Sequence, residues 1–270
     1  MTDLSGVGAA DAFLLDRRKR DLKTLHRSGL AIAFISECAS PLGSRVYVVG
    51  LELSGKSLAN LPRQIRSQTT IYRRVLDHFY LPRIPEPSVS TALFEICASR
   101  YEKLVDQKRN VRNIALLLRT AVHHSRVHGP LRTLDFGCGT GLSTLALRLL
   151  PETTSRRIDL IGTDASPTML SLASRGGLRT IDFGDWLGMP ESSFEAIIAS
   201  FVLHCGLLDR ELEAIGKQLV PQGIFVANYF GAGRSTLGAF QKKAARVRLM
   251  KIGSIERDPK NPILVFRAKG

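Results

Sequence analysis

The feature that most constrains this chain is the segment LDFGCGTG at residues 134–141, where an apolar run meets one acid and three alternating glycines. Glycines at this spacing indicate a tight turn in which the backbone comes close to a neighbouring group. Asp135 stands directly before the turn, and burying its carboxylate costs free energy unless a partner offsets the cost. The pattern therefore predicts a ligand-binding loop, with a tight turn that binds nothing as the alternative.

The residues around this loop alternate between strand-like and helical patterns. Such alternation predicts an α/β fold with a mostly parallel sheet and crossover helices. After residue 248, two strand-like runs are separated by only a few residues, which predicts an antiparallel hairpin at the C-terminus. The expected strands are 133–136, 158–163, 179–183, 196–201 and 223–229, and the expected helices are 142–150, 166–174, 208–218 and 234–247.

The residues before this alternating region have a different character. The prolines of residues 81–88 cannot continue a helix and are typical of a linker. We therefore predict an N-terminal α+β extension at residues 1–88, acting as a lid or in substrate or partner binding, and a second domain at 89–270. The expected elements up to the glycine loop are a helix at 10–27, a hairpin built from LAIAFI and RVYVVGLEL, a helix at 58–79 and a long helix at 92–123.

The glycine spacing and the acid together restrict the ligand. A dinucleotide-binding loop reads G-x-G-x-x-G, whereas this loop reads G-x-G-x-G. A pyrophosphate would also be repelled by the carboxylate of Asp135. An α-amino group next to a sulfonium meets the requirement, because it is positively charged and rich in hydrogen-bond donors.

At this point the sequence resembles a known family, the class I S-adenosylmethionine-dependent methyltransferases, over roughly residues 92–270. The resemblance implies a Rossmann-like sheet whose last strand is reversed. One departure is Glu195, which stands where the family usually has Asp. The segments that carry the resemblance are LDFGCGTG, GTDASPTML (162–170), the stretch 182–205 with FEAIIASFVLHC at its end, LVPQGIFVANYF (219–230) and the lead-in ASRYEKLV (98–105).

The resemblance also implies roles for individual residues. Asp164 would accept both ribose hydroxyls, Asp185 would accept from the adenine amino group, and Trp186 would lie by the adenine ring. Tyr101 would close over the methionine end, and Ser200 to His204 would face the donor methyl. His204 is a candidate general base on the acceptor, with simple packing as its alternative. The expected cofactor-binding residues are Tyr101, Asp135, Gly137, Cys138, Gly139, Gly141, Asp164, Ala165, Met169, Asp185, Trp186, Ser200 and Phe201.

The charge distribution bears on the methyl acceptor. The formal net charge is +14, with net charges of +9 over residues 1–128, −3 over 129–233 and +8 over 234–270. Basic segments such as RRKRDLK (17–23) and QIRSQTTIYRR (64–74) favour anionic partners. RNA methylation is therefore one hypothesis, although aromatic residues for base stacking are few near these segments.

A small-molecule or carrier-bound acceptor is the leading hypothesis, because the N/D-P-P-Y/F sequence of nucleobase amine methylases does not follow the fourth expected strand. A non-enzymatic protein that keeps the cofactor site is a third and weaker one. The four cysteines are scattered, which predicts neither a zinc site nor disulfides. No run approaches the length of a membrane span, and we expect a cytoplasmic protein.

Overall fold

The structure is a computed structural model, and it describes residues 12–16, 32–51, 72–76, 79–82, 85–127, 129–155, 157–231, 234–256 and 258–269. The chain divides into two compact units, residues 1–104 and 105–270. Each unit has its own sheet and its own core. Within the described ranges, no helix is both long and apolar enough to cross a membrane.

The second unit is built on a six-stranded sheet in the order β10-β11-β9-β8-β6-β7. Strands β7, β6, β8 and β9 run parallel, while β11 pairs antiparallel with both β9 and β10. A mostly parallel sheet that ends in an antiparallel hairpin confirms the expected fold class. The strands are β6 (Leu131–Phe136), β7 (Ile158–Thr163), β8 (Phe194–Ala199), β9 (Leu219–Asn228), β10 (Leu249–Ile255) and β11 (Ile263–Ala268).

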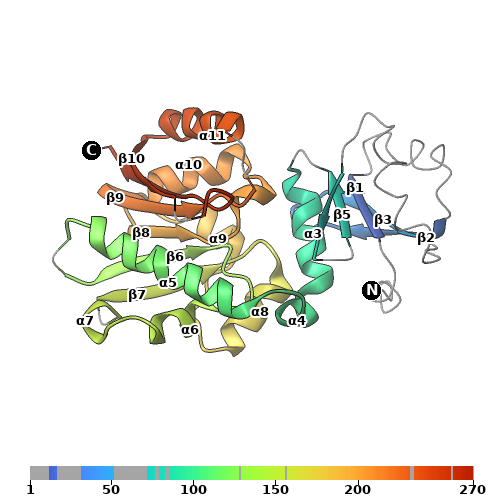
Figure 1. Cartoon of the computed structure of the whole chain (residues 1–270), viewed down its shortest axis with the longest axis horizontal. Coiled ribbons are helices and arrows are strands. Elements are labelled where there is room, and N and C mark those ends of the chain that lie inside the picture. The colour runs from blue at the N-terminus through green and yellow to red at the C-terminus, as the bar shows by residue number, and fades with distance from the viewer. Residues whose placement is uncertain are drawn as a thin grey trace. The chain divides into compact units, whose positions relative to one another are not determined.

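Helices cover both faces of this sheet (Figure 1). Because side chains alternate along a strand, Ile198 of β8 packs in one core with α5, α6 and α8, and its neighbour Ile197 packs in the other with α9, α10 and α11. The helices are α5 (Gln107–His124), α6 (Ser143–Arg148), α7 (Glu152–Ser155), α8 (Pro167–Arg175), α9 (Phe183–Leu187), α10 (Asp209–Gln218) and α11 (Arg234–Arg246).

The strand expected at 179–183 is wrong, because only one isolated β-bridge forms there. Thr180 pairs with Gly162 at the edge of β7. The chain then leaves the sheet because Asp182 accepts a hydrogen bond from the backbone N–H of Gly184 and begins α9. An N-terminal cap of this kind favours the helix over continued pairing.

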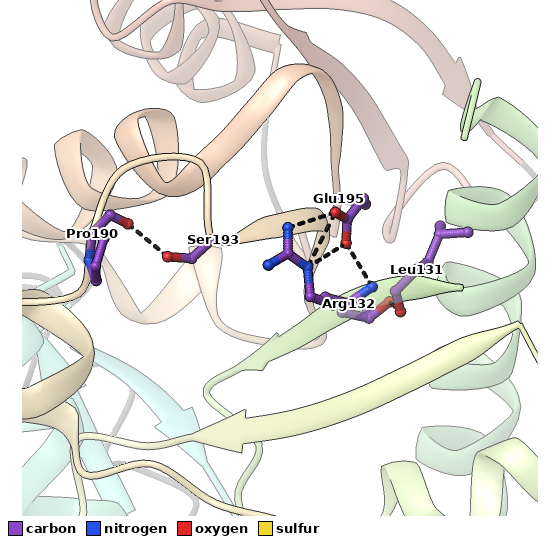
Figure 2. A network of polar contacts seen from close by, with 6 residues as sticks. Leu131, Arg132, Pro190, Ser193 and Glu195 are labelled. Carbon is purple, nitrogen blue, oxygen red and sulfur yellow. Dashed lines mark hydrogen bonds and ion pairs between the residues drawn. The ribbon is translucent and has the colours of Figure 1, made fainter. Parts of the chain in front are cut away.

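The ion pair between Arg132 and Glu195 joins the first halves of two neighbouring strands (Figure 2). The Glu195 carboxylate accepts from the backbone N–H of Arg132 at 2.8 Å and from its guanidinium at 2.7 Å. Burial opposes ionisation of Glu195, but the hydrogen bonds from Arg132 outweigh it and lower the pKa of that carboxyl. The departure from the family's Asp thus lies in a contact between β6 and β8, and Glu195 stands at the second residue of its strand.

The first unit has a five-stranded sheet in the order β2-β3-β1-β5-β4. The expected hairpin is confirmed, since β2 and β3 pair antiparallel. Helix α3 (Pro87–Cys97) packs on this sheet, and a 3₁₀ turn and the short α4 (Tyr101–Leu104) follow it. The strands are β1 (Ala12–Asp16), β2 (Ile32–Ala39), β3 (Arg45–Leu51), β4 (Tyr72–Val75) and β5 (Phe79–Pro82).

Two expected helices of the first unit are wrong where the structure describes them. Residues 12–16 form β1, which pairs with β3 on one side and β5 on the other. Residues 72–75 form β4 rather than the end of a helix at 58–79. The remainder of both expected helices, 17–27 and 58–71, lies outside the described residues.

The boundary between the units also differs from the expected one after residue 88. Val89, Leu93 and Cys97 of α3 are buried in the core of the first unit, so this unit extends to Leu104. The long helix expected at 92–123 is therefore interrupted, and α5 begins anew where Asp106 accepts from the backbone N–H of Arg109.

Candidate functional site

The glycine loop lies at the carboxyl end of β6, between this strand and α6. Gly137, Gly139 and Gly141 have φ angles of 73°, 55° and 84°, in the left-handed region that favours glycine. The backbone N–H groups of Gly137 and Cys138 both donate to the carbonyl of Thr163, at 2.9 and 3.0 Å. The end of β7 thus holds the loop in place.

The space around the three glycines shows which of them a ligand would meet. A Cβ on Gly137 would lie 2.4 Å from Val202 Cγ2, and one on Gly141 would lie 3.0 Å from Ala173 Cα. No atom of the described residues lies within 4 Å of the place that a Cβ on Gly139 would take. Two of the glycines are therefore required by packing, whereas Gly139 borders open space in which a ligand can approach the backbone.

Asp135 is almost completely buried, with 1% of its surface exposed. Its Oδ2 has no hydrogen-bond partner among the described residues. Burial raises the pKa of Asp135 to about 7; the hydroxyl of Ser143 works against this rise, and the charge of Asp164 adds to it. The Oδ2 atom, buried and without a donor from the described part of the chain, fits the cationic, donor-rich ligand that the sequence predicts.

Asp164 directly follows β7 and faces the loop. Its Oδ2 accepts from the backbone N–H of Gly139 and its Oδ1 from that of Ser166, both at 2.8 Å. Ser166 in turn caps α8 by accepting from the backbone N–H of Met169. Each carboxylate oxygen has a second lone pair, so Asp164 can organise the loop and still accept from a ligand hydroxyl.

Of the other expected cofactor residues near the loop, Met169 and Cys138 are buried and Ala165 is partly exposed. Met169 lies in the core side of α8, and Cys138 is buried with a pKa raised well above the usual thiol value, chiefly by burial. A thiol that is buried and hard to ionise is a poor nucleophile. Ala165 lies between Asp164 and the α8 cap and is partly exposed.

Trp186 is fully buried, and its ring packs at 4.9 Å from that of Phe136 and at 5.4 Å from that of Phe183. These contacts give the indole a role in the core, and its place beside adenine stays a prediction. Asp185 is exposed on α9. Tyr101 belongs to the first unit, where its ring meets Phe94 edge-on, and its contact with the cofactor also stays a prediction.

The segments after β8 and β9 carry three rings that we call the aromatic cluster: Phe201 and His204 after β8, and Phe230 after β9. Their centroids are 5.8 to 6.5 Å apart in edge-to-face arrangements. Phe230 is 38% exposed, and the guanidinium of Arg109 lies 5.4 Å from its centroid. Because β6, β7, β8 and β9 are parallel, this cluster and the glycine loop lie at the same edge of the sheet.

Sequence reasoning anticipated the loop, Asp164 and the segment after β8, but it missed Arg109, Phe230, Asn113 and Asn261. Phe230 had one available signal, since it follows directly after an expected strand. The other three are single polar residues on a helix or in a turn, and only the tertiary fold brings them to the site.

Comparisons with known proteins agree with this geometry. Residues 134–227 match the family model described as a methyltransferase domain. The chain is 34% identical over 113 residues to trans-aconitate 2-methyltransferase of Pseudomonas paraeruginosa, which covers 39% of this chain and 38% of that protein. It is 32% identical over 120 residues to ribosomal RNA small subunit methyltransferase C of Shewanella loihica, covering 41% and 35%. The chain thus spans less than two fifths of each relative.

The fold has a counterpart among solved structures. A TehB-like S-adenosylmethionine-dependent methyltransferase from Corynebacterium glutamicum superposes with a TM-score of 0.50 and 22% identity, over 66% of this chain and 99% of that one. The segment that matches the family model contains the glycine loop, Asp164 and the end of β8, which are the parts that form the site. The second unit therefore has the fold of an S-adenosylmethionine-dependent methyltransferase, and its residues 134–227 match a methyltransferase domain.

Proposed function

We propose that this chain is a cytoplasmic enzyme that transfers the methyl group of S-adenosylmethionine to a small-molecule or carrier-bound acceptor. The observation that carries this proposal is the aromatic cluster at the carboxyl ends of β8 and β9. It presents partly exposed apolar surface at the sheet edge where ligands of such folds bind. A small organic acceptor can pack against rings of this kind.

The residues around the loop fit the cofactor. Asp164 would accept from the ribose hydroxyls of the cofactor, and Asp135 would accept from its amino group. At Gly139 the cofactor would lie close to the protein backbone. When bound, the cofactor supplies an electrophilic methyl group on a sulfonium. The chain's own contribution is mainly to place the acceptor in line with that methyl and to exclude water. His204, in the aromatic cluster, would accept the proton that an acceptor hydroxyl or amine loses.

Arg109 adds a preference within this class. Its guanidinium lies over the ring of Phe230 and also contacts Asp258 at 3.5 Å, with both side chains about half exposed. A long, exposed ion pair is weak, so an anionic group on the acceptor can compete with Asp258. An acceptor that combines an apolar body with an anionic group suits these surroundings.

RNA is the second candidate acceptor, and a separate observation favours it. Helix α11 and strand β10 carry Lys242, Arg246 and Lys251 within the C-terminal segment of net charge +8. One relative is a ribosomal RNA methyltransferase by name. The basic segment 17–23 lies outside the described residues, as do residues 64–71 of the second one. Basic surface alone favours sequence-independent binding to phosphates.

One experiment separates the two candidates. The full chain is incubated with cell extract and cofactor labelled in its methyl group, and the extract is then separated into RNA, protein and small-molecule fractions. We expect the label in the small-molecule or carrier-protein fraction. Label in a discrete RNA species would reverse the ranking, and no transfer to any fraction would contradict the proposal as a whole. A Gly139→Val variant is the control for label that moves without the enzyme.

A further inference from the structure

Three asparagine side chains form a chain of hydrogen bonds at the end of β8, which we call the asparagine ring: Asn113, Asn228 and Asn261. The backbone N–H of Phe201 donates to Asn228 Oδ1 at 2.7 Å, and Asn228 Nδ2 donates to Asn261 Oδ1. Asn261 Nδ2 donates to Asn113 Oδ1 at 3.3 Å, and Asn113 Nδ2 donates to Ser200 Oγ at 2.9 Å. The bonds start and finish on two neighbouring residues, Phe201 and Ser200.

The members of the ring come from separate parts of the second unit. Asn113 lies on α5, Asn228 is the last residue of β9, and Asn261 lies in the turn before β11. Asn228 is fully buried. Burying an amide is unfavourable unless its polar atoms are paired, and here each amide both accepts and donates within the ring. A buried polar network in which every amide nitrogen and oxygen has a partner fixes one geometry more strictly than apolar packing does.

The asparagine ring ends at Phe201, whose backbone conformation is unfavourable on its own. Phe201 has a φ angle of 57°, in the left-handed region that bulky residues rarely adopt. Such a conformation persists only where the surrounding structure holds it, and it is concentrated at functional sites. The hydrogen bond from its N–H to Asn228 supplies that hold, and the bond to Ser200 fixes the preceding residue.

The turn at Phe201 sets the direction of the aromatic cluster. The ring of Phe201 meets those of His204 and Phe230 edge-on, and His204 follows it by three residues. We propose that Asn228, Asn113 and Asn261 are positioning residues, which lock the left-handed turn at Phe201 and thereby orient Phe201 and His204 toward the methyl acceptor. This inference rests on the proposed function, because it assigns the aromatic cluster to the acceptor.

Positioning of this kind predicts a specific pattern of effects. Two expected cofactor contacts, Ser200 and Phe201, are held by the asparagine ring, and they would face the donor methyl, which S-adenosylhomocysteine lacks. The residues expected to hold the amino group and the ribose, Asp135 and Asp164, lie at the carboxyl ends of β6 and β7. Loss of the ring should therefore slow methyl transfer and leave cofactor affinity nearly unchanged. A residue that merely stabilised the domain would lower both together, or neither.

The test compares Asn228→Ala and Asn113→Ala with Asn110→Ala, a control on the same helix that is not part of the ring. Binding of S-adenosylhomocysteine is measured by calorimetry. The rate of methyl transfer is measured at saturating labelled cofactor, with the extract fraction that accepts the label supplied as substrate at several dilutions. We expect Asn228→Ala to lower the maximal rate at least about tenfold, Asn113→Ala to lower it less, and Asn110→Ala to leave it unchanged. Cofactor affinity should stay within about threefold in all three.

A crystal structure of the Asn228→Ala protein gives a readout that does not depend on activity. We expect Phe201 to leave the left-handed region and the aromatic cluster to change its arrangement. A turn that keeps its φ angle, or a rate equal to wild type, would overturn the inference. If Asn228→Ala does not fold, the same structure and rate are measured on Asn113→Ala. If the wild type labels no fraction, the proposed function fails, while the crystal structure still decides whether the ring holds the turn.

Discussion

At the residue scale, two glycines offer a matched test of the cofactor loop. Gly139 and Gly177 both have left-handed backbones, with φ angles of 55° and 86°, and no atom of the described residues lies within 4 Å of the place that a Cβ would take on either. Valine at either site strains the backbone to a similar extent. Only Gly139 belongs to the loop beside Asp164. We expect Gly139→Val to abolish detectable binding of S-adenosylhomocysteine in calorimetry and Gly177→Val to retain it. Equal affinities in the two folded variants would contradict the placement of the cofactor.

Asp135 makes cofactor affinity depend on pH. The pKa of this carboxyl is raised to about 7 by burial, so the ligand-free protein keeps it protonated below that pH. An ammonium group on the ligand requires the charged form. Affinity for S-adenosylhomocysteine should therefore rise by up to about tenfold per pH unit below pH 7 and level off above it. Titrations from about pH 5.5 to 8.5 test this, and the Asp135→Asn variant should show weak, nearly pH-independent binding.

The raised pKa of Asp135 makes the stability of the ligand-free protein fall with rising pH, whereas it makes cofactor affinity rise. Because the folded pKa lies above the ordinary value of 3.8, the contribution of Asp135 to stability is fully present below that value. It is lost as the pH rises through about 7. Without a ligand, denaturation midpoints should therefore decline over this range relative to Asp135→Asn, and cofactor should restore them at high pH.

Two replacements of His204 distinguish a general base from a residue that only packs. His204→Phe keeps an aromatic ring for Phe201 and Phe230 but removes the proton acceptor, whereas His204→Ala removes both. If His204 is the general base, both variants should lower the rate of methyl transfer by roughly 10²–10⁴ with unchanged cofactor affinity. If the His204→Phe enzyme transferred methyl at the wild-type rate, the imidazole of His204 would have only a packing role.

At the scale of the elements, the sequence predicts best where a strand is bounded by clear local signals. The expected strand 158–163 matches β7 at both ends, and the residue directly after it is the charged Asp164. The expected helix at 10–27 is wrong over residues 12–16, because spacing alone does not decide between helix and strand. Ala12 and Leu14 are fully buried in β1, and the pairing of β1 with β3 and β5 decides the outcome.

The site shows the same division. Asp135, Gly139 and Asp164 lie in contiguous motifs at strand ends, so sequence reasoning finds them. The asparagine ring is built from residues that are more than thirty positions apart, and no local pattern marks Asn113 or Asn261. Contacts of this kind depend on how the elements meet, which only the folded structure shows.

Helix α10 offers a prediction about how elements pack. A Cβ on Gly216 would lie 2.2 Å from the carbonyl oxygen of Val247, at the turn between α11 and β10. Around Gly238, within α11, the described residues leave open the place that a Cβ would take. Gly216→Ala should lower the free energy of unfolding by about 1–3 kcal/mol, because backbone must move. Gly238→Ala should raise it by about 0.5–1 kcal/mol through helix propensity. Denaturant titration measures both, and equal effects would contradict the close contact.

At the scale of the whole molecule, charge is distributed unevenly along the chain. The part that contains the glycine loop and Asp164 is mildly acidic, with a net charge of −3 over residues 129–233, while the segments on either side are strongly basic. The cofactor site therefore needs none of the excess positive charge. That charge is available for an anionic partner, and its relation to catalysis depends on the acceptor.

The salt dependence of RNA binding tests what the basic surface does. Each phosphate contact releases counterions, so log affinity for single-stranded RNA should fall with log salt by about 0.7 per contact. If the acceptor is a small molecule, we expect only weak binding that does not depend on RNA sequence. Lys242→Glu and Arg246→Glu on α11 should each reduce the salt slope by about 0.7, and Lys217→Glu on α10 should leave it unchanged. Tight binding to one RNA sequence that survives high salt would instead favour RNA as the methyl acceptor, because base contacts rather than phosphate contacts would then supply the affinity.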